Sequence, residues 1–346
     1  MIPVIGHGAI RRELRALAAS VEPPHALMLV GQDGSGRRLL ALELAALLNC
    51  EAPFDQRPCG ACRACRLIAA GSHPDVVHLG PGDVLCKPRP GESSHESHPD
   101  SRDIRICQVR GLIDAVARYP FEGTFRVVII EPADRFAHAA AHTILKTLEE
   151  PPPHTVFVLV TAAPEAILET IRSRCRRIDV GLVPRAEIEQ GLIDRGVDPA
   201  TAARAAAESR GRPGRAVVFA ERPSLMDDRG RLLARCAQIA ASRLSDRLAY
   251  AADLSERWRR DRQLVHAELD TWEDFWEQRL RAAVAAPEAA SDAVAALRAV
   301  AGARDDLEAN VQPRLALDLM LLRFPAVTLE PLATETTEET EAPAHA

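Results

Sequence analysis

The chain has 346 residues, of which 47% are hydrophobic, 27% charged and 4% aromatic. This balance is typical of globular proteins with a buried core and excludes collagen-like or wholly disordered chains, and the length predicts two or three domains. The formal net charge is −6, and a Thr/Glu-rich C-terminal tail holds five of the glutamates. The remainder is close to neutral, so we expect this chain alone to have little electrostatic affinity for DNA.

The sequence offers no sign of a membrane span or a secretory signal. No apolar run approaches the ~20 residues that cross a bilayer, and residues 1–7 lack the charged and apolar regions of a signal peptide. We therefore expect a cytoplasmic protein. In that reducing compartment the eight cysteines do not predict a disulfide framework, and four of them, Cys86, Cys107, Cys175 and Cys236, are expected to be isolated, packed or free thiols.

The first half of the chain alternates short apolar runs with helical patterns. Strands are expected at 26–30, 75–79, 126–130 and 155–161, and helices at 13–19, 37–45, 108–119 and 137–150. This alternation predicts a parallel sheet with helices on its faces.

Composition changes suggest where the domains end. Residues 80–102 contain many helix and strand breakers and are expected to be a flexible insertion, while the chain after Pro184 has helical spacing with breaks at 211–214 and 222–224. We expect an α/β domain at 1–181, a small helical lid domain at 182–222, a C-terminal helical domain at 223–325 and a disordered acidic tail at 326–346.

A glycine-rich turn follows the first expected strand. Residues 31–36 have the spacing of a phosphate loop, with Gly31, Gly34 and Gly36 as backbone donors and Arg37 at the position of the phosphate-binding lysine. Arg38 replaces the hydroxyl that would bind Mg²⁺, so phosphate binding is possible but hydrolysis is not expected. The alternative is a tight strand-to-helix turn that binds nothing.

The second position needed for ATP hydrolysis follows the strand at 126–130. ATPases of this architecture place there an acid that holds Mg²⁺ through water, followed by a glutamate that activates water. This chain has Glu131 and Pro132, and proline cannot act as a general base. Two independent defects in one reaction predict that the chain does not hydrolyse ATP.

Four clustered cysteines predict a metal site. Cys50, Cys59, Cys62 and Cys65 have the Cys-x2-Cys spacing that lets neighbouring thiolates occupy adjacent vertices of a tetrahedron around Zn²⁺. Four protein ligands leave no open position, so the zinc would be structural and would order a module at 50–65 inserted after the phosphate-loop helix. The alternative is four unligated thiols.

One further motif introduces the second expected strand. His73-Pro74-Asp75 is interpreted as a turn, in which proline fixes the backbone and Asp75 satisfies N–H groups close to it in sequence.

Several blocks of sequence resemble the bacterial clamp-loader subunits, a branch of the AAA+ ATPases. The blocks lie at 26–31, 59–65, 127–134, 145–152 (Leu-Lys-Thr-Leu-Glu-Glu-Pro-Pro) and 171–175 (Ile-Arg-Ser-Arg-Cys). Because both ATPase motifs are degraded while Ser173-Arg174-Cys175 is intact, the chain is most similar to the ATPase-deficient delta-prime family of DNA polymerase III. The resemblance implies an AAA+-like α/β domain followed by two all-α domains, the last of them an oligomerisation collar.

The resemblance also implies a function and partners. Arg174 would be an arginine finger that reaches in trans into the ATP site of a neighbouring subunit. The partners would be the tau/gamma motor subunits and the delta subunit in a hetero-pentamer, the sliding clamp, and primed DNA through the complex.

Three alternatives remain open from the residues themselves. The arginines around Arg174 form a solvated basic face at a helix end. The chain is an active ATPase in which Arg37 replaces the lysine, or it is a zinc-dependent nucleic-acid-binding protein unrelated to clamp loading.

Overall fold

The computed structural model of the chain describes residues 4–20, 22–87, 98–283, 286–309, 311–325 and 327. It divides into two compact units, Met1–Pro223 and Ser224–Ala346. Residues 88–97 of the expected insertion, and the expected acidic tail apart from Val327, lie outside the described residues. The first unit contains a five-stranded sheet with helices, and the described part of the second unit is helical.

The sheet confirms the predicted parallel α/β architecture. Its strands are β1 (Ala26–Val30), β2 (Val76–Leu79), β3 (Arg126–Ile130), β4 (Thr155–Thr161) and β5 (Arg176–Asp179). They pair in the order β2-β3-β4-β1-β5, and every pairing is parallel. All residues of β1, β3 and β4 are buried, as expected for central strands covered on both faces.

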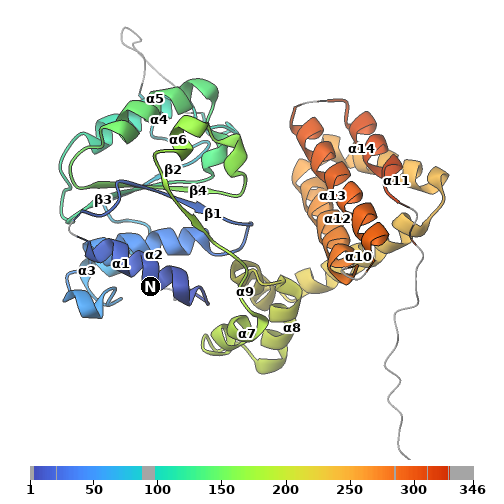
Figure 1. Cartoon of the computed structure of the whole chain (residues 1–346), viewed down its shortest axis with the longest axis horizontal. Coiled ribbons are helices and arrows are strands. Elements are labelled where there is room, and N and C mark those ends of the chain that lie inside the picture. The colour runs from blue at the N-terminus through green and yellow to red at the C-terminus, as the bar shows by residue number, and fades with distance from the viewer. Residues whose placement is uncertain are drawn as a thin grey trace, which may run out of the picture. The chain divides into compact units, whose positions relative to one another are not determined.

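Helices cover both faces of this sheet (Figure 1). One face carries α1 (Gly8–Ala19), α2 (Arg37–Asn49) and α3 (Arg63–Ala69), and the other carries α4 (Ile106–Val116), α5 (His138–Glu149) and α6 (Glu169–Arg172). Strand β4 contributes side chains to the hydrophobic cores on both faces of the sheet, because successive side chains of a strand point to opposite faces. Val156, Val158 and Val160 pack with α1 and α2, whereas Phe157 and Leu159 pack with α4 and α5.

Three further helices complete the first unit, α7 (Arg185–Ile193), α8 (Pro199–Ser209) and α9 (Pro213–Glu221). Asp198 caps α8 by accepting a hydrogen bond from the Thr201 N–H, and Arg210 ends it in a left-handed conformation. Short 3-10 turns lie at η1 (Phe54–Gln56), η2 (Ala133–Arg135) and η3 (Pro164–Ala166). The sheet and helices α7 to α9 belong to the same compact unit. The domain boundary expected near residue 182 therefore stays a prediction.

The second unit has a core of its own. Its helices are α10 (Ser224–Ala241), α11 (Leu244–Arg260), α12 (Arg262–Ala282), α13 (Pro287–Glu308) and α14 (Pro313–Leu322). Trp272 and Trp276 of α12 are buried and pack against the Phe324 ring in tilted and edge-to-face arrangements. Tyr250 of α11 donates a hydrogen bond to the buried carboxylate of Glu268, which ties α11 to α12.

None of the described helices is long and apolar enough to cross a lipid bilayer.

Asp75 joins the beginnings of β2 and β3. Its fully buried carboxylate accepts hydrogen bonds from the N–H groups of Phe121, Glu122 and Gly123 at 2.6–2.9 Å, and from the Arg126 guanidinium at 3.0 Å. Burial opposes ionisation, but these N–H groups and Arg126 outweigh it and lower the pKa of Asp75. The expectation that Asp75 serves N–H groups close to it in sequence is wrong, since its partners lie 46–51 residues further along the chain.

Candidate functional site

The glycine-rich turn keeps the backbone of a phosphate loop. Residues 31–36 connect β1 to the N-terminus of α2, and Gly34 and Gly36 have φ angles of 79° and 98°, which side chains disfavour. A Cβ on Gly31 would lie 2.4 Å from the Val180 carbonyl oxygen, so only glycine fits there. The strand, glycine-rich turn and helix that the spacing predicted are therefore present, and phosphate binding by the turn stays a prediction.

Arg37 occupies the position of the phosphate-binding lysine. Its buried side chain forms an ion pair with the exposed carboxylate of Asp33, one turn earlier. The other terminal nitrogen, Nη1, and the buried Ser35 hydroxyl have no hydrogen-bond partner among the described residues. The loop thus retains buried polar groups at a helix N-terminus, but this chain's own Asp33 already neutralises the arginine.

Arg38 and Glu131, the residues that the sequence analysis compared with the metal-binding positions of ATPases, lie close together. Arg38 Nη1 lies 3.5 Å from a carboxylate oxygen of Glu131, which follows β3. Burial raises the pKa of Glu131, and the neighbouring Arg38 and Arg37 oppose that rise. Arg38 offers a cation where a metal needs a hydroxyl ligand, and Pro132 offers no proton acceptor. The arrangement lacks the two groups that hydrolysis requires from these positions.

Helix α9 contacts this loop directly, a contact that the sequence analysis missed. The Gly214 N–H donates a hydrogen bond to the Gly34 carbonyl at 2.8 Å, and a Cβ on Gly214 would lie 3.0 Å from the same oxygen. On the other side of the loop, His7 Nε2 lies 2.7 Å from the Ser35 carbonyl oxygen. The glycine beside Pro213 at the start of α9 was the available signal, since it permits a close backbone approach.

Arg174 lies between α6 and β5, within the block 171–175 of the family resemblance. Its guanidinium donates to the Thr170 carbonyl at 2.7 Å and pairs with Glu149 at 2.5 Å, and 34% of its side chain is exposed. Glu149 is the last residue of α5 and belongs to another block of the family resemblance, residues 145–152. Two motifs separated in sequence therefore meet at this arginine.

The neighbouring arginines are compensated by acids of this chain. Arg176 pairs with Glu13 at 2.8 Å, and Arg177 pairs with Asp179 at 2.7 Å. Both arginines belong to the edge strand β5, whereas Arg172 lies in the last turn of α6. Exposed pairs of this kind contribute little to stability, about 0–1 kcal/mol each.

The strand register fixes where Arg174 lies relative to the phosphate loop. Arg176 pairs with Leu27 near the start of β1, whereas the phosphate loop begins after Val30, at the other end of that strand. Because the two strands are parallel, Arg174, which precedes β5, lies toward the end of the sheet where the strands begin, and Gly31 lies at the end where they finish. The four residues from Leu27, opposite Arg176, to Gly31 correspond to about 13 Å at ~3.3 Å per residue.

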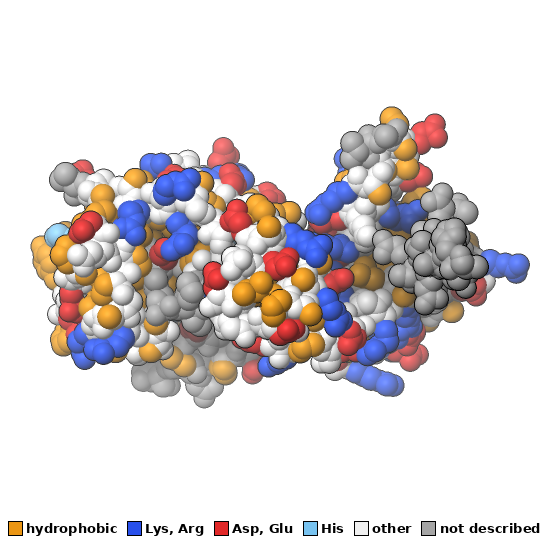
Figure 2. Space-filling model, turned by 90° about the horizontal axis from the view of Figure 1, so that it is seen from below, with side chains coloured by type: hydrophobic (Ala, Val, Ile, Leu, Met, Phe, Trp, Pro, Cys, Tyr) orange, Lys and Arg blue, Asp and Glu red, His pale blue; other side chains and the backbone are white. Residues whose placement is uncertain are grey.

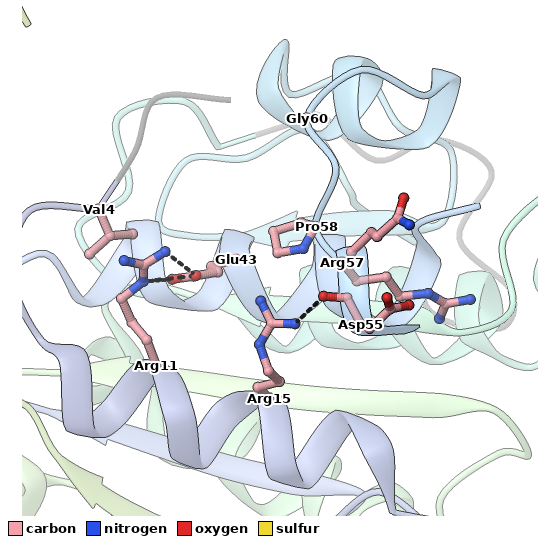
Figure 3. A pocket seen from close by; sticks show the side chains of 9 residues that line it. Val4, Arg11, Arg15, Glu43, Asp55, Arg57, Pro58 and Gly60 are labelled. Atoms are coloured by element: carbon pink, nitrogen blue, oxygen red, sulfur yellow. Dashed lines mark hydrogen bonds and ion pairs between the residues drawn. The ribbon is translucent and has the colours of Figure 1, made fainter. Parts of the chain in front are cut away.

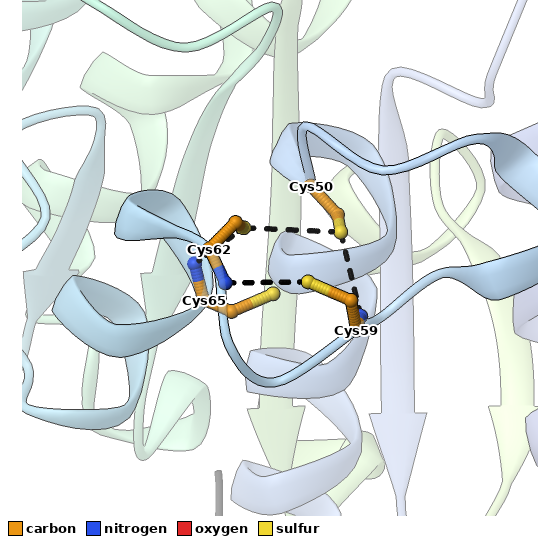
Figure 4. Close-up of side chains that lie close together, drawn as sticks. All are labelled: Cys50, Cys59, Cys62 and Cys65. Atoms are coloured by element: carbon orange, nitrogen blue, oxygen red, sulfur yellow. Dashed lines mark hydrogen bonds between the residues drawn. The ribbon is translucent and has the colours of Figure 1, made fainter.

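The four clustered cysteines converge as their spacing predicted (Figure 4). Cys50 follows the C-terminus of α2, Cys59 lies in the following turn, and Cys62 and Cys65 lie at the start of α3. Their four sulfur atoms lie within 4.8 Å of one another. The N–H groups of Cys59, Cys62 and Cys65 each point at the sulfur of a preceding cysteine at 3.3–3.4 Å.

This donor set fits a zinc ion. Four Zn–S bonds of ~2.3 Å place the sulfurs of a tetrahedral site about 3.8 Å apart, and the Cys50 and Cys62 sulfurs are 3.9 Å apart. The N–H groups of Cys62 and Ala61 lower the pKa of Cys59 to about 6, whereas burial raises that of Cys65. Soft thiolates favour Zn²⁺ over Mg²⁺ or Ca²⁺.

We expect the chain to bind one zinc ion through this cluster. Metal analysis after extensive dialysis should find one Zn²⁺ per wild-type chain, and Cys62→Ser should lower that ratio well below one because it removes a thiolate. Cys175→Ser is the matched control, since that cysteine lies before β5 and outside the cluster. Equal zinc content in the wild-type and Cys62→Ser chains would contradict the assignment.

A pocket of about 300 Å³ separates the cysteine module from α1 (Figure 3). Arg11 on α1 pairs with the buried Glu43 of α2 at 2.9 Å, and Arg15 points at the carbonyls of Phe54 and Asp55 in η1. The pocket walls carry both basic and acidic side chains. These contacts connect the module to the sheet domain rather than forming a site of one charge sign.

A family model described as "DNA polymerase III, delta subunit" matches residues 6–183, just over half of the chain. The chain belongs to the delta-prime family of DNA polymerase III subunits. It is 38% identical to the delta-prime subunit of Pseudomonas aeruginosa over 46% of this chain and 44% of that one. The delta-prime subunit of Escherichia coli is 34% identical over 48% and 46% of the two chains, and the tau subunit of Bacillus subtilis is 34% identical over 51% and 28%.

The chain thus spans a little under half of the length of the delta-prime relatives it matches. Among solved structures, a gamma subunit-related protein of Thermotoga maritima aligns over 90% of this chain and 97% of its own, with 19% identity and a TM-score of 0.40. The family assignment confirms the resemblance drawn from residues 26–31, 59–65, 127–134, 145–152 and 171–175, all of which lie inside the matched region.

Proposed function

We propose that the chain is a non-catalytic clamp-loader subunit that supplies Arg174 to the ATP site of a neighbouring motor subunit. Its partners would be tau/gamma motor subunits and a delta subunit in a hetero-oligomeric ring. Within that ring it would help to couple ATP binding and hydrolysis to loading of the sliding clamp on primed DNA. Relatives named as delta-prime and tau subunits of DNA polymerase III support this assignment.

The position of Arg174 carries the proposal. It precedes β5, at the end of the sheet where the parallel strands begin, whereas the phosphate loop of its own chain follows the other end of β1. An arginine finger acts by direct contact with the transferred phosphoryl group. A partly exposed Arg174 can therefore stabilise such a group only when another chain presents it.

The phosphate loop of this chain has a different role in the proposal. With Asp33 bound to Arg37, Glu131 bound to Arg38 and α9 bonded to Gly34, the loop is held by contacts within the chain. These contacts would fix the lid helices α7 to α9 against the sheet. The loop would then be a structural joint, and Gly31, Gly34, Gly36 and Arg37 would not take part in catalysis.

The cysteine cluster would be structural as well. A zinc ion held by Cys50, Cys59, Cys62 and Cys65 supplies charge neutralisation for four thiolates and cross-links the turn at η1 to α2 and α3. Binding to DNA would be a property of the complex. Lysine and arginine side chains lie among aspartates and glutamates on the face shown in Figure 2, without a continuous basic stripe.

Arg38→Ala tests the non-catalytic role. We expect the isolated chain to hydrolyse no ATP, and a complex reconstituted with motor and delta subunits to turn over ATP equally with the wild-type and Arg38→Ala chains. Arg38 is largely exposed and its pair with Glu131 is long, so the variant should fold normally. Magnesium-dependent turnover by the isolated wild-type chain that Arg38→Ala alters would instead support an active ATPase.

A further inference from the structure

Two cysteines outside the zinc cluster lie side by side. The sulfur atoms of Cys86 and Cys107 are 3.7 Å apart, with Cys107 buried in the first turn of α4 and Cys86 partly exposed. The expectation that these two cysteines are isolated is therefore wrong. It failed because 20 residues separate them in sequence, and only the path of the chain between β2 and α4 brings them together.

Backbone contacts hold the two thiols in place. The Lys87 N–H donates to the carbonyl of Cys107 at 3.0 Å, and the Lys87 ammonium pairs with Asp114 two turns further along α4. Gly111 of α4 lies so close to the preceding segment that a Cβ there would be 2.9 Å from the Leu85 carbonyl oxygen. Residues 85–87 are thus packed along the surface of α4.

The other end of this segment is equally well anchored. The buried Gln108 amide donates to the carbonyls of Gly80 and Asp83 at 2.9 and 3.0 Å, and the Gly80 N–H donates to the Asp83 carboxylate. A Cβ on Gly80 would lie 2.7 Å from the Glu131 carbonyl oxygen. The segment that carries Cys86 therefore runs from the acid position of the degenerate ATP site to the first turn of α4.

We propose that Cys86 and Cys107 form a redox pair, which closes an intramolecular disulfide when a low-molecular-weight disulfide oxidises the protein. The sulfurs must approach from 3.7 Å to about 2.05 Å, a shift that rotation of the more exposed Cys86 side chain can supply. The anchored backbone on both sides keeps the partners from drifting apart. This inference is independent of the role proposed for Arg174.

The chemistry balances with glutathione disulfide as the oxidant. The Cys86 thiolate attacks one sulfur of the oxidant, which releases one glutathione thiolate and leaves a mixed disulfide on Cys86. The Cys107 thiolate then attacks the Cys86 sulfur and releases the second glutathione. Two protein thiols are oxidised to one disulfide, one glutathione disulfide is reduced to two thiols, and each protein thiol gives up one proton.

The surroundings of Cys86 make both the formation and the reduction of the disulfide slow. Burial raises the pKa of Cys86 and the adjacent Cys107 raises it further, while the N–H group of His98 and the charge of Arg105 oppose the rise. A thiol that is rarely ionised at neutral pH attacks slowly. The same raised pKa makes the Cys86 sulfur a poor leaving group when a thiol attacks the disulfide, so reduction is slow as well.

The consequence is a covalent link between α4 and the segment that leaves β2. In the reduced protein these elements are joined by hydrogen bonds and one ion pair between Lys87 and Asp114. In the oxidised protein the chain from 86 to 107 becomes a closed loop. Oxidation would fix the position of Cys86 on α4.

Tryptic peptide mapping tests the proposal. The full-length protein, kept in zinc-containing buffer, is equilibrated with glutathione disulfide, alkylated and digested. Trypsin releases Cys107 in the five-residue peptide 106–110, and Cys86 in the peptide 67–102 because Lys87 and Arg89 both precede proline. We expect these two peptides to be linked in most of the oxidised protein and to separate after treatment with dithiothreitol.

Two variants control the experiment. Cys86→Ser, at the more exposed position, should abolish the linked pair, whereas Cys175→Ser should leave it unchanged. Protein in which Cys86 and Cys107 carry separate glutathione or alkyl groups, with no linked pair at any ratio of glutathione disulfide to glutathione, would overturn the proposal. Linkage of the 67–102 peptide mainly to a cysteine peptide other than 106–110 would overturn it as well.

Discussion

Replacing Asp75 with alanine is expected to lower the free energy of unfolding by about 3–5 kcal/mol. The change leaves the buried guanidinium of Arg126 without its carboxylate, and loss of one partner of a buried ion pair costs about that much. It also removes the acceptor for the N–H groups of Phe121, Glu122 and Gly123. Chemical denaturation of the two proteins at pH 7 measures the difference.

Asp179→Ala is the matched control for this experiment. Asp179 also pairs with an arginine, Arg177, but 67% of its side chain is exposed. Its loss should cost no more than about 1 kcal/mol. Equal destabilisation by the two substitutions would show that the buried carboxylate has no special role in joining β2 to β3.

The lowered pKa of Asp75 adds a pH dependence of known sign. A carboxyl group that is more acidic in the folded than in the unfolded protein stabilises the fold above its unfolded pKa of about 3.9. That contribution is lost as the pH falls through the folded pKa. The stability difference between wild type and Asp75→Asn should therefore narrow progressively below about pH 4, and a constant difference from pH 7 to pH 3 would contradict the assignment.

Much of the sheet could be predicted because its central strands are continuous apolar runs. The expected bounds of β1, β3 and β4 agree with the structure, since residues buried on both faces leave an unambiguous hydrophobic pattern. Strand β5 was missed for the opposite reason. Its sequence, Arg-Arg-Ile-Asp, buries only Ile178, so an edge strand resembled a basic surface segment.

The site shows the same division between local and distant information. The cysteine cluster could be predicted because its four ligands lie within 16 residues and their spacing reflects the geometry of a metal site. The distant partners of Asp75, the pairing of Cys86 with Cys107 and the contact of Gly214 with the phosphate loop could not. Each joins segments at least 20 residues apart, whose proximity depends on the order of the strands.

Replacing Arg174 with alanine is expected to cost about 10³ in the rate of ATP hydrolysis at the one site it serves in an assembled complex. In the chain itself Arg174 pairs with Glu149, and a partly exposed pair contributes only about 0–1 kcal/mol. Breaking this ion pair, so that Arg174 can contact a phosphoryl group of a neighbouring subunit, therefore costs little free energy. The total ATP turnover of the complex should fall by the fraction that this one site contributes. Arg174→Lys should not restore it, because an ammonium group lacks the planar set of donors of a guanidinium.

Two neighbouring substitutions separate this effect from a general loss of charge. Arg177→Ala removes an arginine of β5 whose side chain is more exposed than that of Arg174, 51% against 34%, and should leave turnover unchanged. Glu149→Gln frees Arg174 from its partner in the chain and should maintain or raise turnover. A fall of similar size in Arg174→Ala and Arg177→Ala would indicate that net charge at the subunit contact matters, and not a specific finger.

The most direct test of the proposed function is the steady-state ATP turnover of a clamp loader reconstituted with motor and delta subunits, in the presence of clamp and primed DNA. Complexes containing the wild-type or the Arg174→Ala chain are compared after gel filtration has shown that both assemble. A clear fall in turnover with assembly intact is the predicted result. Equal turnover by two intact complexes would contradict a role for Arg174 in its neighbour's active site.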